Sequence, residues 1–213
     1  MSVLAQFPSE KAKKLGITLD ANQEEQLLRF AELVAADGIT MGLSGRKTLE
    51  EILEKDILDS LLLVPLLDSA HHLLDIGSGA GFPGIVLKIA LPTLSLTLLE
   101  AKQKALKFLE SVKQTLNLDL EIVTGRAEES KNNPQLKARF DVVTGRAVAP
   151  LLRFLPWAVP YLKPSGKLIL QKGSRWEAEL NAAKPELAKF KLVVKSVLAG
   201  MQGDQKVLVL GKA

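Results

Sequence analysis

The stretch "HLLDIGSGAGFPGIVLKIALPTLSLTLLE" (residues 72–100) decides the fold of this chain. It starts with a short apolar run, turns through three glycines at alternate positions, continues for the length of a helix and ends in a second apolar run. That order is typical of a strand–helix–strand unit, in which the two strands lie parallel in one sheet. We therefore predict strands over residues 72–76 and 94–100.

The same alternation continues toward the C-terminus. Further short apolar runs occupy residues 118–124, 140–145 and 166–172, mostly separated by segments long enough for a helix. The end differs, because "FKLVVKSVLAG" (190–200) and "QKVLVLGK" (205–212) are joined by only four residues, too few for a crossover helix. The pattern predicts an α/β domain over residues 71–213, with a mostly parallel sheet and a C-terminal antiparallel hairpin.

Residues 1–70 have the apolar spacing of helices. Ser9 can cap a short helix, Asp20 a longer one that Gly38 stops, and Thr48-x-x-Glu51 is a capping box. We expect a small N-terminal helical cap, not a second large domain.

Composition excludes several classes of protein. The chain has no cysteine and only two histidines, which are adjacent, so disulfides, thiolate metal sites, a cysteine nucleophile and a serine–histidine triad are not expected. We predict no metal site. The first residues contain too short an apolar run for a signal peptide, and the run at 61–67 is too short to span a bilayer. These features predict a cytoplasmic protein that does not enter a membrane.

Charge divides the chain unevenly. Residues 1–70 have a net charge of −5, and residues 71–213 have a net charge of +9. The basic part suits a polyanionic partner such as nucleic acid, and a solvated lysine-rich surface accounts for the same charge equally well.

The glycine loop itself fits two cofactors. Gly77, Gly79 and Gly81 allow a close backbone approach to a ligand, and Glu100, 21 residues after Gly79, can accept hydrogen bonds from a ribose. These features fit both a nicotinamide dinucleotide and S-adenosylmethionine. Asp75 favours the latter, because a carboxylate beside the loop opposes a pyrophosphate and suits a sulfonium.

A family resemblance rests on more than this loop. "GSGAGFPG" (77–84), "GRAEE" (125–129), "RAVA" (146–149), "YLKPSGKLILQKG" (161–173) and the upstream "EILEKDILDSL" (51–61) occur in one order over roughly residues 20–212. In this the chain resembles the RsmG (GidB) family, bacterial small-subunit ribosomal RNA guanine-N7 methyltransferases. The resemblance implies a class I S-adenosylmethionine-dependent methyltransferase with a Rossmann-like fold. Its partner would be 16S ribosomal RNA or a small-subunit particle.

The resemblance also implies roles for individual residues. Gly77 and Phe82 would line the cofactor, Ala127 and Glu128 would flank its adenine, and Arg146 would lie at the mouth of the site. Together with Asp75, Gly79, Gly81 and Glu100, these are the candidate cofactor residues.

We further place Arg146 and Lys172 near the RNA. Solvation of Lys172 and a structural ion pair of Arg146 are the alternatives. Guanine N7 carries a lone pair and no proton, so we expect no catalytic general base.

The chain departs from the family pattern at several positions. Asp56 stands at a position usually occupied by histidine, Gly145 replaces a common serine, and "MGLSG" (41–45) stands where Asn-Leu-Thr is typical. Because these changes affect the helical cap and the site mouth, a catalytically inactive RNA-binding relative is one alternative. A nicotinamide-dependent oxidoreductase is the other.

Overall fold

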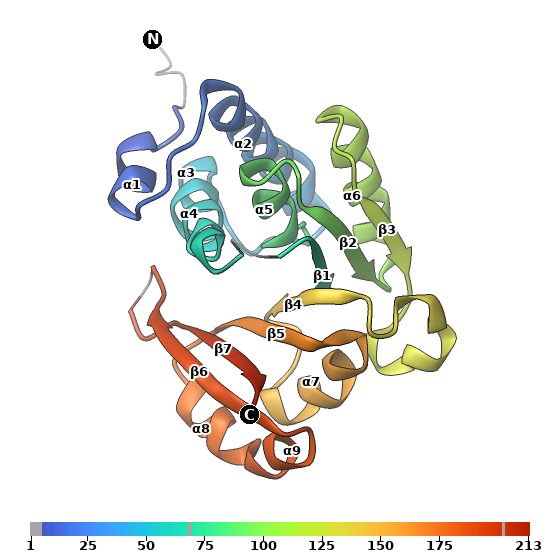
Figure 1. Ribbon diagram of the computed structural model, residues 1–213. Helices are drawn as coiled ribbons and strands as arrows, with labels where there is room; N and C mark the ends of the chain where they lie inside the picture. The colour runs from blue at the N-terminus through green and yellow to red at the C-terminus, as the bar shows by residue number, and fades with distance from the viewer. Residues whose placement is uncertain (1–5, 68–69, 202) are drawn as a thin grey trace.

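A seven-stranded sheet forms the centre of the computed structural model, which describes residues 6–67, 70–201 and 203–213 (Figure 1). The strands lie in the order β3-β2-β1-β4-β5-β7-β6. Their bounds are β1 His72–Ile76, β2 Ser95–Glu100, β3 Glu121–Thr124, β4 Phe140–Arg146, β5 Leu162–Lys172, β6 Leu192–Ala199 and β7 Lys206–Lys212.

Strand direction agrees with the prediction. Strands β1 to β5 pair in parallel, whereas β7 pairs antiparallel with both β5 and β6. The order of the strands in the sheet reverses between β1 and β4. Because these strands are parallel, their carboxyl ends and the loops that follow them lie at the same edge of the sheet. Ligands of open α/β sheets bind at this edge.

Helices cover both faces of the sheet (Figure 1). The helices are α1 Ser9–Lys14, α2 Ala21–Leu33, α3 Leu49–Ile52, α4 Leu58–Leu61, α5 Gly84–Ala90, α6 Gln103–Thr115, α7 Leu151–Ala158, α8 Trp176–Ala182 and α9 Lys184–Lys189. Short π-helical turns lie at Val34–Gly38 and Leu53–Ile57, and 3-10 turns at Val64–Leu66, Ala127–Asn132, Pro134–Leu136 and Val159–Tyr161.

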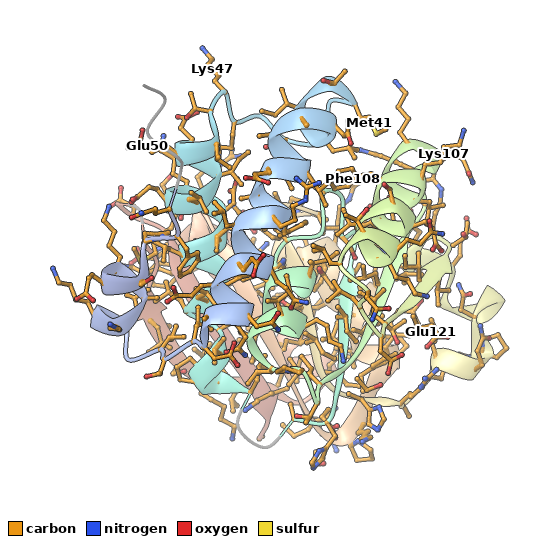
Figure 2. All side chains as sticks on the ribbon, turned by 90° about the horizontal axis from the view of Figure 1, so that it is seen from above. Met41, Lys47, Glu50, Lys107, Phe108 and Glu121 are labelled. Atoms are coloured by element: carbon orange, nitrogen blue, oxygen red, sulfur yellow. The ribbon has the colours of Figure 1, made fainter. Side chains whose placement is uncertain are left out.

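The N-terminal helices and the sheet share one core. Phe30 of α2 and Ile57 are fully buried in the same apolar cluster as Ile85 of α5 and Phe108 of α6. Helix α6 has one buried and one exposed side: Phe108 is buried, and Lys107 is directed outward on the surface (Figure 2). A second cluster, built on α7 and the other face of the sheet, includes Phe154. This packing fixes the N-terminal helices above the edge where β1 and β4 end.

Side-chain caps set the starts of α2 and α3. The Asp20 side chain accepts from the backbone N–H of Gln23, whose side chain accepts from the N–H of Asp20, so α2 begins with a full capping box. Thr48 caps α3 through the N–H of Glu51. Ser9 was predicted as a cap, but Pro8 occupies that position and Ser9 is the first helical residue.

Two strand starts differ from the pattern by three residues or more. Strand β3 begins at Glu121, because residues 118–120 precede its pairing with β2. Strand β5 begins at Leu162, four residues before the predicted start, because Leu162 pairs with Phe140 ahead of a shift in register. None of the helices in the described residues is long and apolar enough to cross a membrane.

Candidate functional site

The glycine loop follows β1 and carries three residues with positive φ. Gly77, Gly79 and Gly81 have φ values of 67°, 55° and 94°. A Cβ on Gly81 would lie 2.8 Å from Ile85 Cγ1, so packing against α5 requires glycine there. At Gly79 a Cβ would meet only the carbonyl oxygen of Gly77, at 3.8 Å, so the space beside this residue is open to a ligand.

Glu100 ends β2 beside that loop. Its carboxylate accepts hydrogen bonds from the backbone N–H groups of Gly79 at 2.9 Å, Ala101 at 2.7 Å and Lys102 at 2.8 Å. The side chain is buried, yet it lines a cavity of about 380 Å³ together with Gly77 and Gly79. A carboxylate held in this way has further lone pairs for hydroxyl groups, such as those of a ribose.

Ala127 and Glu128 form another part of the wall of this cavity, which we call the nucleoside cavity. Ala127 is buried, and its carbonyl oxygen accepts a hydrogen bond from the Tyr161 hydroxyl at 3.2 Å. Burial raises the pKa of Tyr161, so this donor stays protonated. Glu128 lies near Arg126, with 3.5 Å between their charged atoms. Trp157 adds an aromatic surface to the wall.

A second cavity, of about 320 Å³, continues from the loop toward the N-terminal helices. We call it the loop cavity. Phe82 lines it, 5.1 Å from the ring of Phe30 between centroids, and the guanidinium of Arg146 lies 5.9 Å from the ring centre of Phe82. The wall toward the N-terminal helices is formed by Arg46 and Asp56.

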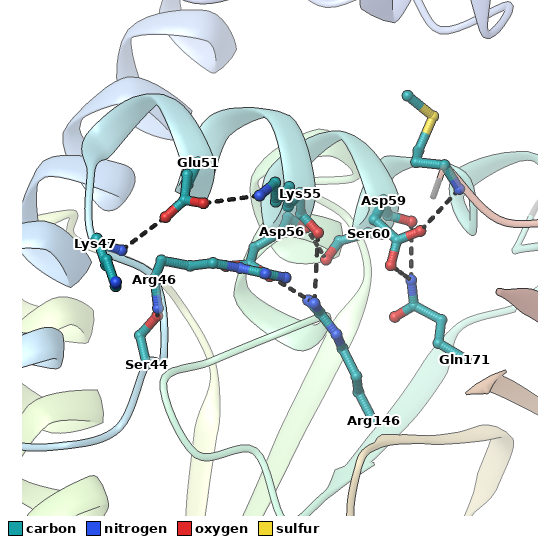
Figure 3. A network of polar contacts seen from close by, with 11 residues as sticks. Ser44, Arg46, Lys47, Glu51, Lys55, Asp56, Asp59, Ser60, Arg146 and Gln171 are labelled. Atoms are coloured by element: carbon teal, nitrogen blue, oxygen red, sulfur yellow. Dashed lines mark hydrogen bonds and ion pairs between the residues drawn. The ribbon is translucent and has the colours of Figure 1, made fainter. Parts of the chain in front are cut away.

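Asp56 joins two arginines from distant parts of the chain (Figure 3). Arg46 donates to it through Nε at 3.0 Å and Nη2 at 2.8 Å, and Arg146 donates through Nη2 at 2.5 Å. The side chain of Asp56 is 6% exposed, so little water screens these pairs. The hydrogen bond to Asp56 raises the pKa of Arg46. One carboxylate between two guanidinium groups leaves a net positive charge at the cavity wall.

A third cavity, of about 450 Å³, lies over the ends of β4, β5 and β7. We call it the strand-end cavity. Arg146, Lys172, Arg175 and Lys206 contribute cations to its lining, and Asp59 and Glu179 contribute carboxylates. Burial raises the pKa of Asp59, although the nearby charge of Arg146 opposes this shift.

Ala147 is the residue at which the three cavities meet, since it lines all of them. It has φ of 55°, a conformation that is costly for a residue with a Cβ and that clusters at functional sites. Beside it, Val148 lies so close to Gly77 that a Cβ on that glycine would be 3.0 Å from Val148 Cγ2. A ligand in the nucleoside cavity can therefore meet a ligand in the strand-end cavity next to Ala147.

Most predicted site residues line these cavities, namely Gly77, Gly79, Phe82, Glu100, Ala127, Glu128, Arg146 and Lys172. Asp75 has a different place, because it is fully buried and its Oδ2 accepts from the backbone N–H of Gly84, at the start of α5, at 3.0 Å. Gly81 likewise serves the packing of the loop. Burial raises the pKa of Asp75 well above its usual value, so this carboxyl does not supply the exposed negative charge expected from the sequence.

Lys172 also differs from its predicted place. Its Nζ donates to the carbonyl oxygen of Ala149 at 3.0 Å and to Glu179 at 2.8 Å, and its side chain is 10% exposed. The lysine therefore holds α8 and the loop after β4 together. It is therefore not a solvated cation, although it lines the strand-end cavity.

Several cavity residues were missed by sequence reasoning, among them Arg46, Asp59, Ala147 and Gln171. Asp56 was noticed only as a departure from a family pattern. Within the described residues, no group of three or more His, Cys, Asp or Glu side chains is placed to hold a metal ion.

Comparison with known proteins gives a consistent result. Residues 23–208 match the family model GidB, described as rRNA small subunit methyltransferase G. The chain is 41% identical over 184 residues to ribosomal RNA small subunit methyltransferase G of Thermobifida fusca, covering 85% of this chain and 74% of that protein. It is 37% identical over 208 residues to the protein of the same name from Sorangium cellulosum, with 96% and 86% covered.

Solved structures share the fold. A ribosomal protein L11 methylase from Lactobacillus delbrueckii has a TM-score of 0.60 at 15% identity, covering 80% of this chain and 81% of that one. An O-methyltransferase described as putative, from Klebsiella pneumoniae, has a TM-score of 0.61 at 18% identity, with 96% of both chains covered. At such identities the likeness shows the fold, which is that of class I methyltransferases. The comparisons give no support to a nicotinamide-dependent oxidoreductase or to an inactive RNA-binding relative.

Proposed function

The chain belongs to the rRNA small subunit methyltransferase G family, and on that premise we propose that it transfers a methyl group from S-adenosylmethionine to N7 of a guanine in 16S ribosomal RNA. The observation that carries the proposal is the meeting of three cavities at Ala147. One cavity has the residues for a nucleoside, and another, with a cationic wall, opens over the strand ends where an acceptor base can enter.

The residues of the nucleoside cavity fit the cofactor. The open space at Gly79 admits a ligand close to the backbone, and the Glu100 carboxylate has capacity to accept from ribose hydroxyls. Ala127 and Glu128 would flank the adenine. Asp75 occupies the first N–H of α5, which is where a nicotinamide dinucleotide would place its pyrophosphate.

When bound, S-adenosylmethionine supplies an electrophilic methyl carbon on a sulfonium. Because guanine N7 has a lone pair and no proton, the chain needs no residue that removes one. Its task is to hold the base in line and to exclude water beside Ala147. His71 and His72 precede or begin β1, at the opposite end of the strand from the glycine loop, which suits a reaction without a histidine base.

The N-terminal helices complete the site in this proposal. Residues 1–70 would act as a cap that supplies Arg46 and Asp56, and residues 71–213 would bind the cofactor and supply Arg146. Arg146, held by Asp56, would then contact a phosphate or guanine O6, which leaves N7 open. The positive charge of residues 71–213 favours RNA as the partner.

The deep, narrow major groove of A-form RNA hides N7 from side chains. We therefore expect the acceptor guanine to lie in a loop or in an opened region of a small-subunit particle. A paired guanine inside a regular helix would not reach Ala147.

Methylation in vitro tests the proposal. Purified protein is incubated with S-adenosylmethionine and 16S ribosomal RNA or small-subunit particles from cells lacking the gene, and the RNA is digested to nucleosides for mass spectrometry. We expect 7-methylguanosine from the wild type and none from the Gly79→Asp variant. Another methylated nucleoside, or no methylation of either substrate, would refute the proposed function.

A further inference from the structure

Two buried hydrogen-bond acceptors in the strand-end cavity have no partner among the residues that the structure describes. They are the side-chain oxygens, Oε1, of Gln171 and Gln205, and both residues line the cavity. Gln171 is only 8% exposed. A buried polar atom without a hydrogen bond is costly, and such atoms in native proteins call for an explanation. A ligand with donor groups that enters this cavity would satisfy them.

The orientation of the Gln171 amide is fixed by Asp59. Gln171 Nε2 donates to the carbonyl oxygen of Asp59 at 3.0 Å and to its carboxylate Oδ2 at 2.7 Å, so both hydrogens of the amide are used. The carboxylate is held in turn by the backbone N–H of Met201, at 3.2 Å from Oδ1. Because Asp59 offers only acceptors there, Oε1 must face away from it. In Figure 3 Oε1 lies on the side of Gln171 that faces Arg146.

Arg146 and Gln171 are also neighbours in the sheet, as partners in the parallel ladder of β4 and β5. The cavity therefore presents a donor and an acceptor side by side at the strand ends. Ala147, the next residue after Arg146, marks the point where methyl transfer would occur. A base that enters with N7 toward Ala147 would place its opposite edge against β5.

Of the two purines, which both carry N7, guanine has the edge that fits this pair when N7 faces Ala147. It carries an acceptor, O6, beside two donors, the N1 proton and the N2 amino group, whereas adenine carries an amino donor where guanine has O6. Enzymes that act on single bases read the Watson–Crick edge of the base in their pockets.

We propose that Gln171 Oε1 accepts a hydrogen bond from the N2 amino group of the acceptor guanine, with Asp59 as the residue that positions the amide. This inference rests on the proposed function, because it names the base-reading residues of that same site. It makes Gln171 a specificity-determining residue that leaves N7 untouched.

Inosine tests the contact directly, because it is guanosine without the N2 amino group and keeps both N7 and O6. A ribosomal RNA fragment carrying the mapped target is prepared with guanosine or with inosine at that position. For the wild type we expect kcat/KM with inosine to be lower by roughly fivefold to thirtyfold. For Gln171→Met, which has a similar shape and no such acceptor, the ratio should fall close to one.

The control variant is Gln114→Met, on the exposed side of α6 and away from the strand-end cavity. It should keep the wild-type ratio. Any intrinsic difference between the two nucleosides in the reactivity of N7 is present in all three proteins, so the comparison of ratios isolates the contact. Equal discrimination by the wild type and Gln171→Met overturns the inference, as does a wild type that methylates both RNAs equally well.

Two further variants test the role of Asp59 in positioning the Gln171 amide. Asp59→Ala should lose discrimination between guanosine and inosine, and Asp59→Asn, whose side-chain oxygen can still accept from Gln171, should restore it. A merely structural role would lower both rates without changing their ratio. The guanosine arm separates this inference from the function, because absence of 7-methylguanosine there refutes the proposed reaction, whereas its presence without discrimination refutes only the role of Gln171.

Discussion

Asp56 accepts a hydrogen bond from Arg146 across 90 residues of sequence, and the contact ties the N-terminal helices to the end of β4. Both residues line the loop cavity. The same carboxylate holds Arg46, so its removal would leave two guanidinium groups facing each other. Asp56, which departs from the family pattern, is therefore the carboxylate that separates the two arginines in this wall.

Replacement of Asp56 by alanine should lower the free energy of unfolding by about 2 kcal/mol, less than for a fully buried pair because both arginines are partly exposed. Denaturant unfolding measures this loss. Glu54→Ala, which breaks the exposed pair with Lys11, is the matched control and should cost under about 1 kcal/mol. Equal losses in the two variants would show that Asp56 is no more than a surface partner.

Cofactor binding should depend on Gly79 and Glu100. Gly79→Asp places a side chain in the open space beside the loop, and Glu100→Ala removes an acceptor of charge-assisted hydrogen bonds, worth roughly 1.5–3 kcal/mol each. We expect calorimetry to show no binding of S-adenosylhomocysteine by the first variant and weakened binding by the second.

Gly16→Asp is the control for the glycine variant. Gly16 also has positive φ and open space around it, but it lies after α1. The Gly16→Asp variant should bind S-adenosylhomocysteine like the wild type, although an aspartate strains the backbone at residue 16 as it does at residue 79. If Gly79→Asp also titrates like the wild type, the nucleoside cavity is misassigned.

Lys172 and Arg175 line the same cavity and should behave differently. Lys172→Ala removes the cation from Glu179, which keeps only the backbone N–H of Leu151, and should lower the free energy of unfolding by roughly 2 kcal/mol. Arg175 is exposed, so Arg175→Ala should leave stability nearly unchanged. Its loss should instead reduce the steepness of the log–log dependence of RNA binding on salt by about 0.7, the value for one phosphate of a single strand. Unchanged stability of Lys172→Ala would contradict its structural role.

The sequence predicted the parts of this site that are local. The order of strand, glycine loop, helix and strand over residues 72–100 follows from patterns within one stretch, and Glu100 could be placed because it ends an adjacent strand. Gln171 and Asp59 are 112 residues apart, and no periodicity brings them together. Asp75 was misjudged because sequence reveals its position beside the loop but not the side of the strand to which its carboxylate points.

Asp75 should make stability depend on pH. Burial raises its pKa in the folded state, so between the usual carboxyl value of about 4 and the raised one the folded chain holds a proton that the unfolded chain has lost. Stability from this residue is therefore greatest at low pH and falls as pH rises through that window. Asn at this position keeps an acceptor for the N–H of Gly84 and does not titrate.

The difference in unfolding free energy, wild type minus Asp75→Asn, should thus fall by up to about 1.4 kcal/mol for each pH unit within that window. Denaturant titrations at several pH values above about 5 measure it. A flat difference for Asp75→Asn would mean that its carboxyl is already ionised in the folded protein.

The chemical step should be independent of pH over about pH 7 to 9, because N7 has no proton to lose. The lower limit of this pH range is set above the usual carboxyl range, because burial raises the pKa of Asp59 in the strand-end cavity. Single-turnover rates at saturating RNA measure this step, and a log-linear rise with pH would indicate a base.

Arg146→Ala should lower the rate of RNA methylation far more than the affinity for S-adenosylhomocysteine. The reason is that its partner Asp56 and its ring contact Phe82 lie in the loop cavity and not around Glu100. Equal losses of both would place Arg146 in the cofactor site instead.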